Sequence, residues 1–263
     1  MPGNRVFWQV ASEIIFLLGA GVLGGALNAM AGGGGFITFP ALIFIGMPPI
    51  QATATYTAAM LPGGIASIGA YRRSYTPETR ALLVPVLLVG VIGGLFGALL
   101  LLRTPPALFM HMVPWLLLSA TVLFWMSPRI VPWMQVVAGR WKHGGLALRL
   151  FPLVLQFLIA IYIGFFGAGA GILVLAMLAL MGVTNIHAMN GLKVILIVVV
   201  NLVAIAMYAL AHAIVWKYAL LMMVGTTVGG YGGAWFSQRL SAVQVRNFVF
   251  ATGIGMTVYF FVR

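Results

Sequence analysis

The feature that most constrains this chain is a run of 58 residues, 14–71, without a formally charged side chain. A helix crosses the hydrocarbon core of a bilayer with about 20 apolar residues. The run is therefore too long for one crossing helix and fits two, with a short segment between them. Six more charge-free runs follow, and together they predict a helical membrane protein; they are 81–102, 104–128, 150–192, 194–216, 218–238 and 247–262.

The composition excludes a soluble enzyme or binding module. Hydrophobic residues make up 63% of the chain and charged residues 6%, whereas soluble domains carry about 25% charged residues. The net charge is +12, but Lys and Arg lie between the apolar runs, which is typical of membrane loops rather than of a nucleic-acid-binding surface. The absence of Cys excludes disulfides and thiolate chemistry. We therefore expect an all-α integral membrane protein.

Proline and glycine divide the apolar runs into about eight long helices and two short segments. The short segments, 35–46 and 171–182, would each be about 18 Å long as helices, which is typical of re-entrant or broken segments rather than of full crossings. A basic cytoplasmic connector is expected at 127–149. The long helices are expected at about 8–30, 51–71, 80–102, 107–126, 150–166, 187–210, 214–237 and 243–262.

The two halves of the chain align without a gap at an offset of 136 residues. This register indicates an internal duplication, with a first half at 1–126 and a second half at 150–263 in one membrane domain. Because the duplication includes the residues from about 24 onward, we expect that the Ala-Met-Ala sequence at 29–31 is not a signal cleavage site. Aligned pairs include Gly33 with Gly169, Gly35 with Gly171, Gly97 with Gly233, and Arg103 with Arg239.

The basic residues allow two membrane topologies. If the short segments are re-entrant, eight helices cross, the halves are parallel, and ten basic residues face three, with both termini in the cytoplasm by the positive-inside rule. If the short segments cross, ten helices form inverted repeats, and nine basic residues face four, with both termini outside. The eight-helix topology has the larger asymmetry, and the ten-helix topology remains the alternative.

Two glycine-rich runs, 32–35 and 167–171, each separate a long from a short apolar segment. An unwound backbone there exposes N–H groups, and the dipole of the next helix adds positive potential, so an anion can bind without side chains. Close helix packing is the alternative explanation of such glycines. Neither run has the features of a nucleotide-binding P-loop. The candidate ligands here are Gly33, Gly34, Gly35, Gly169 and Gly171.

One basic side chain, Lys193, lies well inside an apolar run. Because a charge inside a membrane is costly, such a residue indicates function, although snorkelling to the surface is the alternative. Asn190 and Asn201 lie on about the same helical face. Asn28 lies four residues before the first glycine run, and Thr55 belongs to a stretch rich in Thr. The side chains predicted to contact an anion are therefore Asn28, Thr55, Asn190, Lys193 and Asn201.

Several stretches resemble the TauE/SafE sulfite exporter family over nearly the whole chain. They are 28–40 (NAMAGGGGFITFP), 52–63 (ATATYTAAMLPG), 71–73 (YRR), 164–171 (GFFGAGAG), and 190–193 (NGLK) through Asn201. Position 56 is Tyr where the family pattern has Asn. The resemblance implies movement of sulfur-containing anions, such as sulfite, sulfonates or thiosulfate, across the inner membrane.

The residues and the resemblance together predict a multi-pass secondary transporter of small anions in the inner membrane, working by alternating access. An anion channel and a non-transporting membrane scaffold are the alternatives. The sequence has neither a cluster of His and carboxylates nor a catalytic set, so we expect no metal, no cofactor and no enzymatic activity. The expected partners are the lipid bilayer and an anionic substrate, not nucleic acid, with a coupling proton or ion and a homo-oligomer left open.

Overall fold

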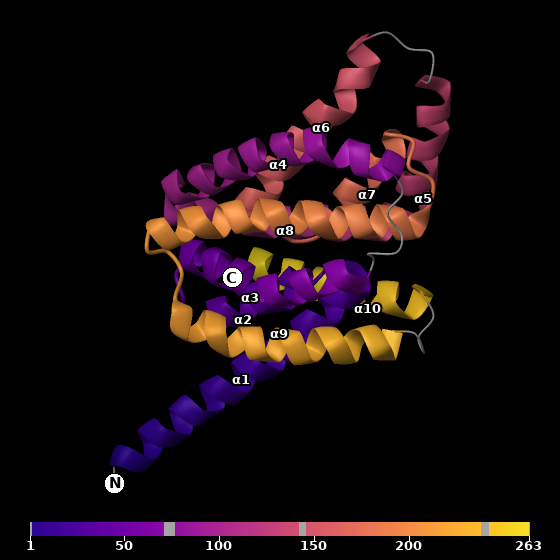
Figure 1. The fold of residues 1–263 in the computed structure, drawn as a ribbon. Helices are drawn as coiled ribbons and strands as arrows, with labels where there is room; N and C mark the ends of the chain where they lie inside the picture. The colour runs from indigo at the N-terminus through magenta and orange to yellow at the C-terminus, as the bar shows by residue number, and fades with distance from the viewer. Residues whose placement is uncertain (1, 71–76, 142–145, 238–241, 263) are drawn as a thin grey trace.

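The computed structural model describes residues 2–70, 77–141, 146–237 and 242–262, and the regular elements in these ranges are all α-helices. The ten segments predicted to be helical are helices (Figure 1). They are α1 (Pro2–Ala31), α2 (Gly35–Phe44), α3 (Pro49–Ala70), α4 (Pro77–Arg103), α5 (Pro106–Trp141), α6 (Leu146–Phe165), α7 (Ala170–Leu180), α8 (Ile186–Leu210), α9 (Trp216–Ser237) and α10 (Ala242–Val262).

Helix α5 is longer than predicted, so the expected loop at 127–149 is wrong for residues 127–141, which continue the helix. The helix continues because its apolar side chains still have packing partners. Val131 and Met134 pack against a core formed by the second half of the chain. Of the rest of the predicted connector, residues 142–145 lie outside the described residues.

The prolines near position 127 suggested a helix end, and the structure explains why they do not end it. Pro128 lies inside α5 and cannot donate a backbone hydrogen bond to the carbonyl of Phe124. The hydroxyl of Ser127 donates to that carbonyl instead, at 2.8 Å. Side-chain hydroxyls commonly satisfy the carbonyls that proline frees in membrane helices.

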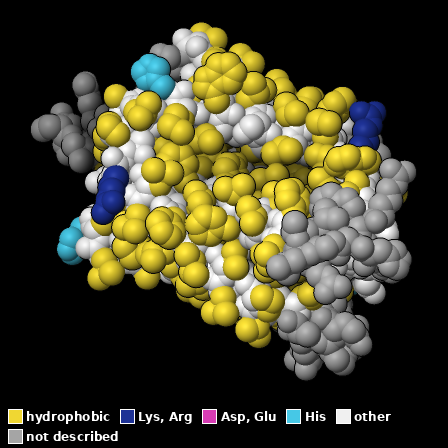
Figure 2. All heavy atoms as spheres, turned by 90° about the horizontal axis from the view of Figure 1, so that it is seen from above, with side chains coloured by type: hydrophobic (Ala, Val, Ile, Leu, Met, Phe, Trp, Pro, Cys, Tyr) yellow, Lys and Arg dark blue, Asp and Glu magenta, His cyan; other side chains and the backbone are white. Residues whose placement is uncertain are grey.

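The outer surface of the molecule is apolar, as expected for a protein in a bilayer. On α4, five large apolar side chains at intervals of four residues are each at least 50% exposed: Val84, Leu88, Ile92, Phe96 and Leu100. Figure 2 shows a face covered by hydrophobic side chains, with the visible Lys and Arg toward its two ends. Four helices are long and apolar enough to cross a membrane, namely Val10–Ala29 in α1, Leu82–Arg103 in α4, Pro106–Gly139 in α5 and His187–Leu210 in α8.

Glycines bring pairs of helices into backbone contact. Helix α1 packs along α9, and helix α4 packs along α6. A Cβ added at Gly21 of α1 would lie 3.2 Å from the Cα of Gly225 of α9. On the other pair, a Cβ added at Gly164 of α6 would lie 3.1 Å from the backbone nitrogen of Ala98 of α4. These glycines therefore have the close-packing role that small residues commonly have between membrane helices.

The ends of the helices show which way each one runs. The last residues of α2 and α10 and the first residues of α3 and α5 meet around a mostly apolar hollow of about 750 Å3, whose lining includes Pro49, Ala107 and Phe261. The backbone N–H of Val215, just before α9, donates to the hydroxyl of Thr55 near the start of α3, at 3.1 Å. Helices α3, α5 and α9 therefore start at one end of the molecule, and α4, α8 and α10 run toward that end.

Candidate functional site

The two interrupted segments, 136 residues apart in sequence, meet in space. A Cβ added at Gly35, the first residue of α2, would lie 3.1 Å from the Cβ of Ala168 in the link before α7. A Cβ added at Gly32 would lie 3.9 Å from the Cα of Gly171. The break between α1 and α2 therefore faces the break between α6 and α7, and the N-terminal ends of the short helices α2 and α7 lie close together.

Glycine is needed at both breaks because the backbone turns through the left-handed region there. Gly32 has φ 72°, and Gly167 and Gly169 have φ 75° and 73°. Residues with a Cβ rarely adopt these values, so the reversal from a long helix into a short one depends on these glycines. The first backbone N–H groups of a helix lack intrahelical partners, and they carry the positive end of the helix dipole. The two breaks therefore combine two helix N-termini in one place.

A small cavity lies between the breaks, with a volume of about 70 Å3. A single buried water needs about 10–15 Å3, so the cavity has room for a small ion with some water. Its walls on α3 and α8 come from the middle of each helix. The lining residues are Asn28, Gly32, Gly35, Tyr56, Thr57, Met60, Leu61, Gly64, Gly167, Ala168, Gly171, Ile197, Val198 and Asn201.

The predicted basic residue lies beside this cavity. A Cβ added at Gly171 would be 3.5 Å from the Cδ of Lys193, so the lysine side chain runs along the second break. Its Nζ donates to the Oδ1 of Asn190 at 2.9 Å, one turn earlier on α8. Lys193 is half-buried, and it lies one turn before Ile197, which lines the cavity. The two acidic residues of the chain, at positions 13 and 78, are not in segments that line it.

Of the ten predicted site residues, the structure brings four into the wall of the cavity and Lys193 with Asn190 to its edge. The four in the wall are Asn28, Gly35, Gly171 and Asn201.

The other four predicted residues lie around the breaks but have packing partners of their own. Gly33 faces Val249 and Phe36, with 3.2 Å between an added Cβ and Val249 Cγ1. Gly34 has no room for a side chain, because an added Cβ would lie 2.8 Å from Met60 Sδ. Gly169 is equally close to Ala120, at 3.0 Å. Thr55 is buried, and its hydroxyl accepts the hydrogen bond from Val215 described above.

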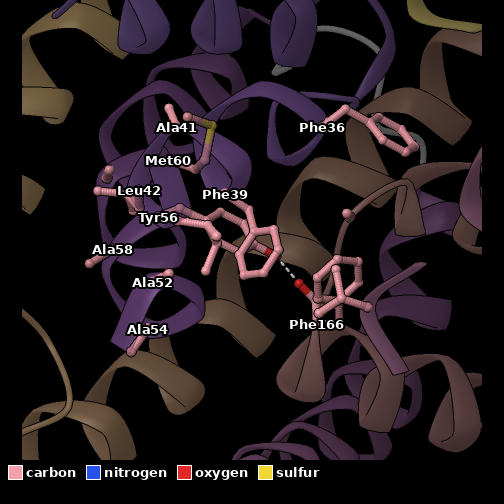
Figure 3. Packing of buried hydrophobic residues seen from close by; sticks show 14 of the residues in the cluster. Phe36, Phe39, Ala41, Leu42, Ala52, Ala54, Tyr56, Ala58, Met60 and Phe166 are labelled. Carbon is pink, nitrogen blue, oxygen red and sulfur yellow. Dashed lines mark hydrogen bonds between the residues drawn. The ribbon is translucent and has the colours of Figure 1, made fainter. Parts of the chain in front are cut away.

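The sequence analysis did not identify Tyr56 as a site residue. Its ring lines the cavity from α3, and its hydroxyl donates to the backbone carbonyl of Phe166 at the second break (Figure 3). The ring packs edge-on against Phe39, with 6.0 Å between ring centroids, and Phe39 packs edge-on against Phe166, with 5.4 Å between centroids. The one sequence signal for this residue was that Tyr replaces the Asn of the family pattern at position 56.

The candidate site is thus enclosed, polar on part of its wall and cationic at its edge. Among the described residues there is no group of three or more His, Asp or Glu that could hold a metal ion. The groups that converge on the cavity are two helix N-termini, amide side chains, one threonine and a nearby ammonium group. All of these can stabilise negative charge, which fits a small anion better than a cation.

Comparisons with known proteins agree with a membrane transporter. The family model described as "Sulfite exporter TauE/SafE" matches residues 17–260. A "Probable membrane transporter protein" of Haemophilus influenzae is 29% identical over 245 residues, which cover 93% of this chain and 92% of the relative.

Two further relatives have similar names. A "Probable membrane transporter protein ORF9" of Sinorhizobium is 28% identical, with 93% and 91% of the two chains covered. The "Probable membrane transporter protein YfcA" of Escherichia coli K12 is 27% identical, with 88% and 83% covered. No solved structure matches this chain.

Proposed function

Because this chain belongs to the TauE/SafE sulfite exporter family of membrane transporters, we propose that it is a secondary transporter of small oxyanions of the sulfite, sulfonate and thiosulfate class in the inner membrane. The observation that carries this proposal is the meeting of the two broken segments around one small cavity. Broken helices whose N-termini point at a shared site, near the middle of the full-length helices, are typical of secondary transporters with anionic substrates.

The chemistry around the cavity supports an oxyanion as substrate. Asn28 and Asn201 supply amide N–H donors from opposite halves of the chain, and Lys193 supplies a positive charge held by Asn190. Backbone N–H groups at the starts of α2 and α7 add donors that need no side chain. A compact oxygen-rich anion can accept several of these hydrogen bonds at once, and its charge would offset the cost of keeping an ammonium group within the membrane.

An inverted repeat supports alternating access as the mechanism. Helices related by the offset of 136, such as α3 with α8 and α4 with α9, run in opposite directions. The packing of α1 on α9 has its equivalent in the packing of α6 on α4. These directions favour inverted halves over the parallel halves of the eight-helix topology, and with them the division of nine basic residues against four, with both termini outside. Inverted halves can exchange roles between an outward-open and an inward-open state.

The test is uptake by the purified protein in liposomes, with labelled sulfite, sulfate, thiosulfate and methanesulfonate compared one by one. A carrier gives a rate that saturates with concentration and exchanges internal for external anion. An open anion channel gives conductance without such saturation. If correctly folded protein moves none of these anions, the proposal fails and a non-transporting scaffold is favoured.

A glycine series tests where the site is. Gly171→Ala should be tolerated, because the added Cβ would make ordinary contacts of 3.5 and 4.0 Å with Lys193 and Ile197. Gly171→Leu extends a side chain toward the cavity and should stop uptake. Gly255→Leu on α10 is the matched control, because nothing lies within 4 Å of that position. Equal uptake by both leucine variants would mean that the substrate does not pass the cavity.

A further inference from the structure

The two breaks differ in how they are held. At the second break, three tyrosine hydroxyls donate to alternate backbone carbonyls. Tyr56 of α3 donates to Phe166, Tyr162 of α6 donates to Ala168 at 2.6 Å, and Tyr208 of α8 donates to Gly164. Two of these bonds come from helices outside the α6–α7 hairpin, so the bonds join the hairpin to both α3 and α8.

The rings of the second break are fixed as well. Phe166 is buried, and its ring packs edge-on against Phe39, Phe109 and Tyr162, at centroid distances of 5.4, 6.3 and 6.4 Å. Tyr208 is also among the largest fully buried side chains. A movement of this break relative to α3 and α8 would separate hydrogen bonds in an apolar region, where no solvent replaces them.

The first break has no such ties among the described residues. Its carbonyls at positions 27, 28 and 33 accept hydrogen bonds from the backbone of Gly32, Gly33 and Phe36, all within the α1–α2 hairpin. The carbonyl of Gly34 accepts from the hydroxyl of Thr38, which is again in the same hairpin.

The repeat explains this difference. At the positions that match Tyr162 and Tyr56 under the offset of 136, the chain has Ala26 and Leu192, whose side chains donate no hydrogen bond. The position that matches Tyr208 is 72, which lies outside the described residues.

Packing of the hairpins on their neighbours does not remove this asymmetry. Helix α1 contacts α9 through glycines such as Gly21 and Gly225, and α6 contacts α4 through glycines such as Gly164. Both surfaces are smooth and lack interlocking side chains. The tyrosine hydrogen bonds are therefore the feature that distinguishes the two hairpins.

We propose that Tyr56, Tyr162 and Tyr208 are positioning residues that make the α6–α7 break a fixed wall of the anion site, while the α1–α2 break is the part that opens. The inference rests on the proposed transport function for its role in transport, but the difference in rigidity does not. The tyrosine hydroxyls hold the start of α7 in place, and the hydroxyl of Tyr56 is engaged by Phe166 rather than offered to the substrate.

The test is hydrogen–deuterium exchange of the full-length protein, followed by mass spectrometry of peptides that cover 26–38 and 162–174. After correction for intrinsic rates, the amides of the second break should exchange more slowly than those of the first. Tyr56→Phe with Tyr208→Phe removes both bonds from outside the hairpin and keeps the rings. Exchange at 162–174 should then rise about tenfold, since each lost bond contributes about threefold, with little change at 26–38 or in the melting temperature.

Equal or faster exchange at the second break in the wild type would overturn the proposal. A slow second break that stays slow in the double variant would also overturn it, because the tyrosines would then not be the cause. If the double variant does not fold, Tyr162→Phe alone gives the same comparison for the bond to Ala168. Uptake measured on the same samples separates the two proposals, since loss of the transport function would leave the exchange difference intact.

Discussion

Replacement of Lys193 by Met is the sharpest test of the anion site. Methionine keeps an unbranched apolar side chain beside Gly171, where Lys193 Cδ lies 3.5 Å from an added Cβ, and removes the ammonium group. If the ammonium binds the substrate directly, the variant loses one hydrogen bond to a charged group, which contributes about 1.5–3 kcal/mol. At about 1.4 kcal/mol for each factor of ten, the KM for uptake should rise about 10- to 150-fold.

The assay is the initial rate of anion uptake into proteoliposomes as a function of concentration. Lys217→Met is the matched control, because it removes the same charge at the start of α9, where the Lys217 Nζ lies 5.2 Å from the ring centroid of Tyr218. We expect its KM to stay within about twofold of the wild type. Asn190→Ala should have a smaller effect, about 3- to 20-fold, because it releases the ammonium group from the hydrogen bond that orients it.

The reasoning is refuted if Lys193→Met transports with the KM of the wild type while both proteins are folded and inserted. Lys193 would then be a lysine whose head group reaches the membrane surface, and the positive charge at the cavity would have no part in binding. Equal rises in KM for Lys193→Met and Lys217→Met would refute it too, because a general effect of net charge on anion approach would explain both.

Three predictions concern stability and are checked by thermal unfolding in detergent. Gly25→Ala should destabilise by about 1–3 kcal/mol, because its Cβ would lie 2.7 Å from the Cα of Thr226; Gly19→Ala, with open space around it, should not, and equal melting temperatures would contradict the α1–α9 contact. Thr226→Val should cost about 0.6–1.7 kcal/mol, because it removes the hydroxyl that donates to the Ala59 carbonyl at 2.7 Å; an unchanged melting temperature would mean that this bond does not join α9 to α3. Gln156→Leu should stabilise by about 1–3 kcal/mol, because the buried amide has no hydrogen-bond partner, and a lower melting temperature would argue against that assignment.

Much of the fold could be predicted from local sequence. The charge-free runs determined that the chain is helical and belongs in a membrane, and glycine and proline marked the limits of the ten helices. The glycine runs also marked both breaks, because only glycine tolerates the left-handed backbone found at Gly32, Gly167 and Gly169. The contact between Lys193 and Asn190 followed from their spacing of three residues on one helix. All of these depend on residues that are close together in the chain.

What the tertiary structure decided is which faces of the helices meet. A sequence locates a glycine run but not the direction in which each of its residues points, so Gly35 lines the cavity while Gly33 packs against α10. Thr55 and Tyr56 are neighbours on α3, yet one hydroxyl bonds to the start of α9 and the other to the second break. Successive residues on a helix point about 100° apart, and the packing of distant helices then determines which of them reaches the site.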